Sequence, residues 1–139
     1  SFLIIVGNEG LKVSLIEIWE VLEMRITGLD INCCRLDSSL LAAGALNGHD
    51  GSRPIEFLVL SLQTDVGIDV ASFGFAGASA IGSGHLAKAA FEPLLLGQNP
   101  LDREKIWQQF RVADRWWNHL PIYSYGPIDI CLWLIGAEA

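Results

Sequence analysis

Basic side chains are scarce in this sequence, which has nine lysines and arginines against sixteen aspartates and glutamates. The formal net charge at pH 7 is −7, and the few basic residues are scattered along the chain. Nucleic acids and anionic membrane surfaces bind proteins through clustered positive charge. The sequence therefore argues against both as partners.

Cysteine is also rare, with only Cys33, Cys34 and Cys131 present. Adjacent cysteines do not pair easily with each other, and the total is odd. Free thiols in a reducing cytoplasm are the expected state.

Long apolar runs and targeting segments are lacking as well. The run FLIIV, residues 2–6, is five residues long and has no basic residue before it. A signal peptide needs a longer apolar core with a basic lead. No stretch approaches the roughly 20 apolar residues that a membrane helix needs. We expect a cytoplasmic protein that does not bind membranes.

What is present suits a folded domain. The chain has 139 residues and is 51% hydrophobic, which allows a core and excludes a disordered chain. Residues 1–23 differ from the rest, because the apolar positions that close them have helical spacing: Leu11, Leu15, Ile18, Trp19 and Leu22. This N-terminal extension could dock on the domain, dock on a neighbour, or be foreign sequence. The domain itself is expected over residues 24–139.

Three strands are predicted after Met24. The stretch LDINCCRL (29–36) alternates apolar and polar residues, and Gly28 before it marks a bulge. IEFLVLSL (55–62) is apolar on both faces, so we expect it to be covered on both. IDVASFGF (68–75) follows a tight turn, QTDVG. The Gly- and Ser-rich residues 37–54 form a long loop of the functional or mobile kind.

Three helices are predicted after Gly77. The first, SGHLAKAAFEPLLLG, is ended or kinked by Pro93 and closed by Gly97. The second begins at Asn99 as N-cap with Pro100 at the first helical position, and its core stripe is Ile106, Phe110, Ala113 and Trp117. The third begins near Pro127 and is apolar on almost every side. The fold class is α+β: a three-stranded antiparallel meander followed by a three-helix bundle.

Several motifs are better explained by structure than by chemistry. GSGHLA, residues 82–87, fits G-x-G-x-x-A, but a second helix follows where a dinucleotide fold needs a strand. No histidine stands at metal-ligand spacing from another histidine or cysteine. His49 and Asp50 suit a solvated loop tip, and Asp129 suits the first turn of a helix. Neither a catalytic residue nor a metal ligand can be assigned in this chain.

The order of these segments resembles the N-terminal capping domain of the mandelate racemase and muconate lactonizing enzyme group of the enolase superfamily. The most specific pieces are LLLGQNPLDREKIWQ (94–108) and PIDICLWLIGAEA (127–139). Members commonly carry a GxxPxxxExLW-like helix start and an S-x-x-D-x-A-L-W-D-I-x-G-K-A helix at these places. The chain departs from this pattern with Cys131 for alanine, Leu134 for aspartate and Glu138 for lysine.

The resemblance implies a lid and specificity domain that is inactive alone. The absent part would be a C-terminal (β/α)₇β barrel, which binds Mg²⁺ and carries the groups that abstract the proton α to a carboxylate. An acid-sugar dehydratase or racemase, forming a homo-oligomer, is expected. The implied lid residues lie at roughly 40–53 and 75–85: Asn47, His49, Asp50, Arg53, Phe75, Ser79 and His85. The alternative is a freestanding α+β module that binds a protein partner through its apolar last helix.

Overall fold

The computed structural model describes residue 19 and residues 23–36, 55–77, 80–115 and 122–139. Within these ranges the predicted α+β order of strands and then helices is confirmed. The elements are β1 (Ile26–Leu36), β2 (Ile55–Thr64), β3 (Asp69–Gly77), α2 (Ala80–Leu95), α3 (Arg103–Ala113) and α4 (Ile122–Glu138). The predicted loop over residues 37–54 and almost all of the predicted helix before Met24 lie outside the described residues.

The three strands form an antiparallel sheet in the order β1-β2-β3, which is the predicted meander. The expected bulge is present, because the β1–β2 register shifts between Ile26 and Gly28. In the predicted β2–β3 turn, Gly67 has a φ of 83°, a conformation that favours glycine. Thr64 closes this turn, since its Oγ1 donates to the Ile68 carbonyl and accepts from the Ile68 amide.

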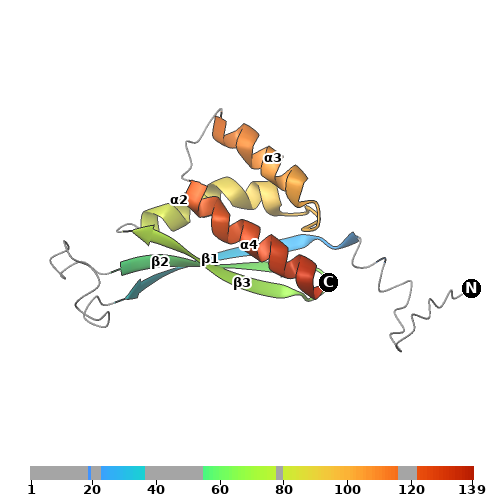
Figure 1. Ribbon diagram of the computed structural model, residues 1–139, viewed down its shortest axis with the longest axis horizontal. Helices are drawn as coiled ribbons and strands as arrows, with labels where there is room; N and C mark the ends of the chain where they lie inside the picture. Colours follow the sequence, from blue (N-terminus) through green and yellow to red (C-terminus); the bar gives the residue numbers. More distant parts are fainter. Residues whose placement is uncertain (1–18, 20–22, 37–54, 78–79, 116–121) are drawn as a thin grey trace, which may run out of the picture.

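One face of the sheet is covered by helices and the other is open among the described elements (Figure 1). Alternate residues of each strand point inward, so Leu29, Leu60 and Val70 are buried beneath the helices. The outward series includes Val59, which is half-buried, and its partner Phe73, which is 74% exposed. The expectation that β2 is covered on both faces is therefore wrong for the described residues, because all three described helices lie on the same side.

The helices form two further layers above the sheet (Figure 1). Helix α2 lies over β1 and α4 lies over β3 and β2, whereas α3 contacts mainly α2 and lies above them. The core between these layers consists of buried apolar side chains: Met24, Ile26, Leu29, Leu58, Leu60, Leu62, Val70, Ala80, Ala87, Phe91, Leu95, Ile106, Phe110, Tyr125, Ile128, Cys131, Leu132 and Ile135. The three cysteines are free thiols, as the sequence predicts.

The G-x-G-x-x-A motif lies inside α2 and serves packing. A Cβ on Gly84 would stand 3.0 Å from Cys33 Sγ and 3.1 Å from Leu58 Cδ2, so the missing side chain lets α2 approach the sheet closely. Pro93 falls within the last turn of α2 and does not end it, but Gly97 follows the helix with a φ of 77°, as expected for the closing residue.

Helices α3 and α4 begin at residues other than those that the sequence predicts. Asn99 caps only a turn, because its Oδ1 accepts from the Leu101 amide at 2.9 Å, and α3 begins at Arg103 with Asp102 as N-cap. Helix α4 begins at Ile122, so Pro127 and Asp129 lie within it rather than in its first turn. In both cases a proline predicts the first helical residue, but neither Pro100 nor Pro127 opens its helix.

Pro127 fixes α4 on the sheet. Its ring lies against Gly74 of β3, where any side chain would collide with it. The carbonyl of Pro127 accepts a 2.6 Å hydrogen bond from Ser72 Oγ, also on β3. The buried side of α4 therefore packs mainly on the sheet, rather than on the preceding helix.

Candidate functional site

Only two of the predicted lid residues, Phe75 and His85, are among the described residues. Asn47, His49, Asp50, Arg53 and Ser79 are outside the described residues. Phe75 pairs with Phe57 between β3 and β2, and His85 is exposed on α2. The lid assignment stays a prediction. The structure describes the frame that flanks the two predicted lid segments, namely the ends of β1, β2 and β3 and the start of α2.

A buried carboxylate joins the elements of this frame. Glu56, the second residue of β2, is 7% exposed and points inward beneath the start of α2. Its Oε1 accepts two hydrogen bonds from Arg35 of β1, from Nη2 at 2.7 Å and from Nε at 3.1 Å. Its Oε2 accepts from the Ala80 amide at 2.8 Å. Glu56 thus ties β1, β2 and the N-terminus of α2 together.

The electrostatics of Glu56 follow from these bonds. The hydrogen bonds from Arg35, and then that from the Ala80 amide, lower the pKa of the carboxyl below its usual value, and burial opposes them only in part. The partial positive charge at the N-terminus of α2 also favours the ionised form of Glu56. No acidic residue in the first turn of α2 offsets this charge. One signal in the sequence points to this site, because Glu56 is an acidic residue at an inward-facing position of an apolar strand.

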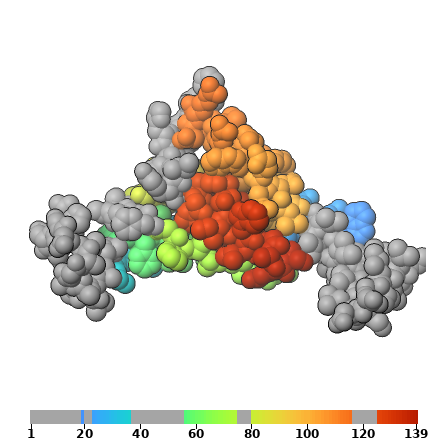
Figure 2. Space-filling view, viewed as in Figure 1, coloured from blue at the N-terminus to red at the C-terminus, as the bar shows by residue number. Residues whose placement is uncertain are grey.

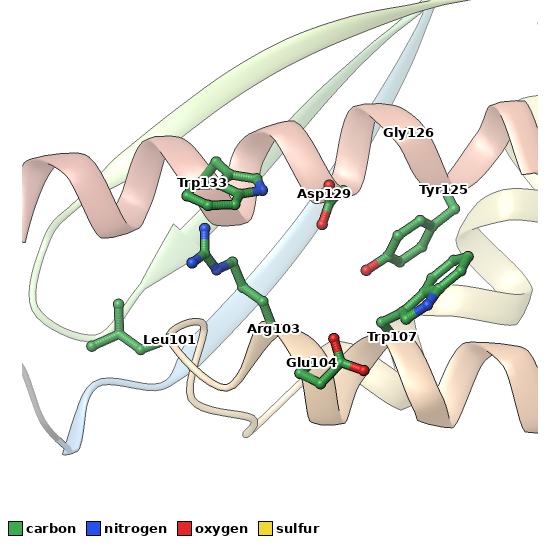
Figure 3. Close-up of a pocket in the computed structure, with 8 residues that line it drawn as sticks. All are labelled: Leu101, Arg103, Glu104, Trp107, Tyr125, Gly126, Asp129 and Trp133. Atoms are coloured by element: carbon green, nitrogen blue, oxygen red, sulfur yellow. The ribbon is translucent and has the colours of Figure 1, made fainter.

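A groove of about 540 Å³ lies between α3 and α4 (Figure 3). It is lined from the α3 side by Leu101, Arg103, Glu104 and Trp107, and from α4 by Tyr125, Gly126, Asp129 and Trp133. Sequence reasoning did not find this groove, because it arises only when two helices separated by a connector come side by side.

Tyr125 is the best-packed residue of the groove. Its ring lies 4.8 Å from that of Phe110 and 4.7 Å from that of Trp107, measured between centroids. The hydroxyl is buried, and no group of the described residues forms a hydrogen bond of good geometry with it, although the Asp129 carboxylate lies close by. Burial raises the pKa of Tyr125 above its usual range, and the nearby Asp129 carboxylate raises it further.

The outer end of the groove is formed by an aromatic–cation contact. The Arg103 guanidinium lies 3.3 Å from the centre of the Trp133 ring. Trp133 is still 59% exposed, and its neighbours Ile130 and Leu134 are 49% and 39% exposed. We call these three residues the outer face of α4. In Figure 2, helix α4 (red) lies at the surface that faces the viewer and is not covered by another described element.

The resemblance places Mg²⁺ in the absent barrel, and the described residues of this chain form no metal site of their own. Among them, no three histidine, cysteine, aspartate or glutamate side chains are grouped closely enough to hold a metal ion. Within the same residues, no helix is both long and apolar enough to cross a bilayer.

Comparison with known proteins gives structural but not sequence matches. No family model and no curated protein matches the chain. A mandelate racemase/muconate lactonizing enzyme from Polaromonas sp. JS666 matches with a TM-score of 0.64 and 25% identity over 84% of this chain. An L-talarate dehydratase from the same organism, in complex with Mg and L-glucarate, matches with a TM-score of 0.65 and 26% identity over 83%. The L-talarate/galactarate dehydratase of Salmonella typhimurium LT2 shares the fold at 19% identity, with a TM-score of 0.62 over 96% of this chain.

These likenesses concern only part of each known structure. The chain spans 30%, 32% and 34% of the three structures, in the same order. The resemblance predicted from the sequence is confirmed: the described fold is that of a fragment of enolase-superfamily proteins of the mandelate racemase and muconate lactonizing type.

Proposed function

We propose that this chain is the substrate-capping domain of an enolase-superfamily enzyme that abstracts the proton α to a carboxylate. The observation that carries the proposal is the asymmetry of coverage, since 84% of this chain matches 30% of a mandelate racemase/muconate lactonizing enzyme. A domain that corresponds to less than a third of an enzyme is expected to perform only part of that enzyme's function. Enclosure of the substrate and exclusion of water are the parts that suit a domain whose described residues form no metal site.

The substrate class is proposed from the similar enzymes. One similar structure is an L-talarate dehydratase complexed with Mg and L-glucarate, and another is an L-talarate/galactarate dehydratase. We propose an acid-sugar dehydratase, with a racemase as the related possibility. Mg²⁺ would be held by a barrel outside this chain, where it would supply positive charge beside the substrate carboxylate. The contribution of residues 24–139 is to close over the acid sugar, with Glu56 holding the base of both lid segments.

The test begins with the mass of the protein isolated from its natural source. A barrel of this kind takes roughly 250 residues, so the natural polypeptide should be far heavier than the 15.2 kDa of this chain. That polypeptide should convert an acid sugar such as L-talarate or galactarate to a keto acid when Mg²⁺ is added. Residues 1–139 alone should show neither this activity nor micromolar Mg²⁺ binding by calorimetry.

A second candidate function is a freestanding interaction module. The observation that favours it is the outer face of α4, where three large apolar side chains are exposed. Such patches mark protein interfaces. A natural polypeptide of 15.2 kDa that captures a protein partner through Trp133 would favour the module over the capping domain.

A further inference from the structure

We infer that the groove between α3 and α4 is a recognition site for a lysine or arginine side chain of the barrel surface that covers α4. The identity of that surface rests on the proposed function. The chemistry of the site rests only on the groove, and it can be tested separately.

Charge is the first argument. Glu104 of α3 and Asp129 of α4 place carboxylates on opposite walls of the groove, on either side of the Tyr125 hydroxyl (Figure 3). The one basic residue of the lining, Arg103, is turned onto the Trp133 ring. No ion pair joins Asp129 to a basic side chain among the residues that the structure describes. A half-buried carboxylate without a counter-ion gains most from a cation when a partner surface displaces water.

The buried hydroxyl of Tyr125 is the second, independent argument. The residue is 8% exposed, and its oxygen makes no hydrogen bond of good geometry in the described structure, although the Asp129 carboxylate lies close to it. Three rings hold it in place, namely Phe91, Trp107 and Phe110. The hydroxyl therefore cannot swing away to find a partner, and a small shift of the exposed Glu104 side chain would let an incoming N–H donate to it. Buried polar groups are normally satisfied, so an unsatisfied one in a groove indicates a missing donor or acceptor.

The aromatic walls favour the same kind of occupant. Trp107 and Tyr125 lie at 4.7 Å between centroids and are tilted by 41°, so ring surface borders the space between the two carboxylates. Aromatic faces attract ammonium and guanidinium groups. An anion would be repelled by Glu104 and Asp129, and an apolar side chain would leave both carboxylates desolvated. A long basic side chain satisfies the carboxylates, the hydroxyl and the rings together.

The experiment uses the 139-residue chain and a free probe of the side chain. The Trp107 indole N–H signal, assigned with a Trp107→Phe variant, is followed by NMR during titration with Nα-acetyl-L-arginine amide. A saturable shift with a Kd of about 1 mM or a few times higher is expected. The neutral analogue Nα-acetyl-L-citrulline amide should bind at least about tenfold more weakly, because it has the shape of arginine without the charge.

Two variants locate the effect. Asp129→Asn and Glu104→Gln should each weaken arginine binding about fivefold or more. The matched control is Asp69→Asn, which removes one negative charge from an exposed residue at the start of β3. It should change the Kd by less than about twofold, since its charge is screened from the groove.

Three outcomes would overturn the site: no saturable shift, equal binding of citrulline, or equal weakening by Asp69→Asn and Asp129→Asn. The proposed function fails differently, through a natural polypeptide of only 15.2 kDa. Arginine binding with that small mass would keep the site and reject the barrel as its source.

Discussion

At the scale of single residues, the buried polar side chains differ in how fully they are bonded. The Glu56 carboxylate accepts three hydrogen bonds, and the Thr64 hydroxyl both donates and accepts. The Tyr125 hydroxyl makes no hydrogen bond of good geometry with any described residue. Because a bonded buried group and an unbonded one respond to deletion in opposite ways, these residues give the sharpest tests of the structure.

Glu56→Gln should lower the melting temperature by several degrees at about pH 7. The folded-state pKa of Glu56 lies below the unfolded value, so its stabilising effect is complete above that value, near 4.5, and is lost as the pH falls toward the folded pKa. The difference between Glu56→Gln and the unaltered chain should therefore shrink below about pH 4. Thermal unfolding followed by circular dichroism across this range measures it. Asp69→Asn serves as the control, and an equal loss in both variants would show that Glu56 has no special role.

Tyr125→Phe should leave the free energy of unfolding unchanged or raise it by about 1 kcal/mol, because it removes a buried hydroxyl that has no partner. Ser72→Ala should instead cost about 1 kcal/mol, since it leaves the buried-side carbonyl of Pro127 without its donor. Urea unfolding of both variants makes the comparison. A clear loss of stability in Tyr125→Phe would mean that the hydroxyl is bonded in solution.

At the scale of elements, the sequence predicted the strands better than the helix starts. Alternation along 29–36 and the turn at Gly67 determine the meander, since each strand lies beside its neighbour in sequence. The predicted starts of α3 and α4 are wrong because a proline often marks the first helical residue, whereas here Pro100 is buried in a turn and Pro127 packs on β3. These are tertiary contacts, and no local pattern contains them.

The same distinction applies to the candidate site. Glu56 could have been found from its place in β2, because the two-residue period puts it on the inward face. The groove could not, since the approach of Trp107 to Tyr125 depends on how α3 and α4 pack. The predicted lid residues from Asn47 to Arg53 lie outside the described residues and stay a prediction.

Gly74→Val tests how α4 is seated on the sheet. The added side chain would collide with the Pro127 ring, so α4 must move away from β3 at a cost of about 1–3 kcal/mol. Gly136→Ala is the control, because Gly136 lies on α4 but not at its contact with β3. Its Cβ would meet Leu101 Cδ2 at an ordinary 3.5 Å, and it should gain up to about 1 kcal/mol from helix propensity. If Gly74→Val were as stable as the unaltered chain, α4 would not rest on β3 as described.

At the scale of the whole molecule, the three layers leave two apolar surfaces uncovered among the described residues. One is the outward face of the sheet around Phe73, and the other is the outer face of α4. The second lies beside the charged groove, so a single partner surface could cover both the face and the groove. This combination of apolar area with a few placed charges is typical of protein interfaces.

Trp133→Glu should reduce self-association of the 139-residue chain. Without a covering surface, the exposed Ile130, Trp133 and Leu134 should bring copies of the chain together, because burial of each side chain contributes about 1.5–3 kcal/mol. Light scattering across a concentration series should show larger particles for the unaltered chain than for Trp133→Glu. Val112→Glu, at a site on α3 that is 61% exposed, controls for the added charge. A chain that stays monomeric at high concentration would show that the outer face of α4 does not drive association.

The first residue of β1 is bonded on both sides of its backbone to the segment after α2. The Ile26 amide donates to the Gln98 carbonyl at 3.0 Å, and the Gly97 amide donates to the Ile26 carbonyl at 2.9 Å. Neither bond can open alone while Ile26 stays buried, so the two amides should exchange with deuterium only when the domain unfolds as a whole. Their exchange times should therefore match those of central β2 amides such as that of Leu60. Much faster exchange at Gly97 would mean that the end of α2 opens independently of the sheet.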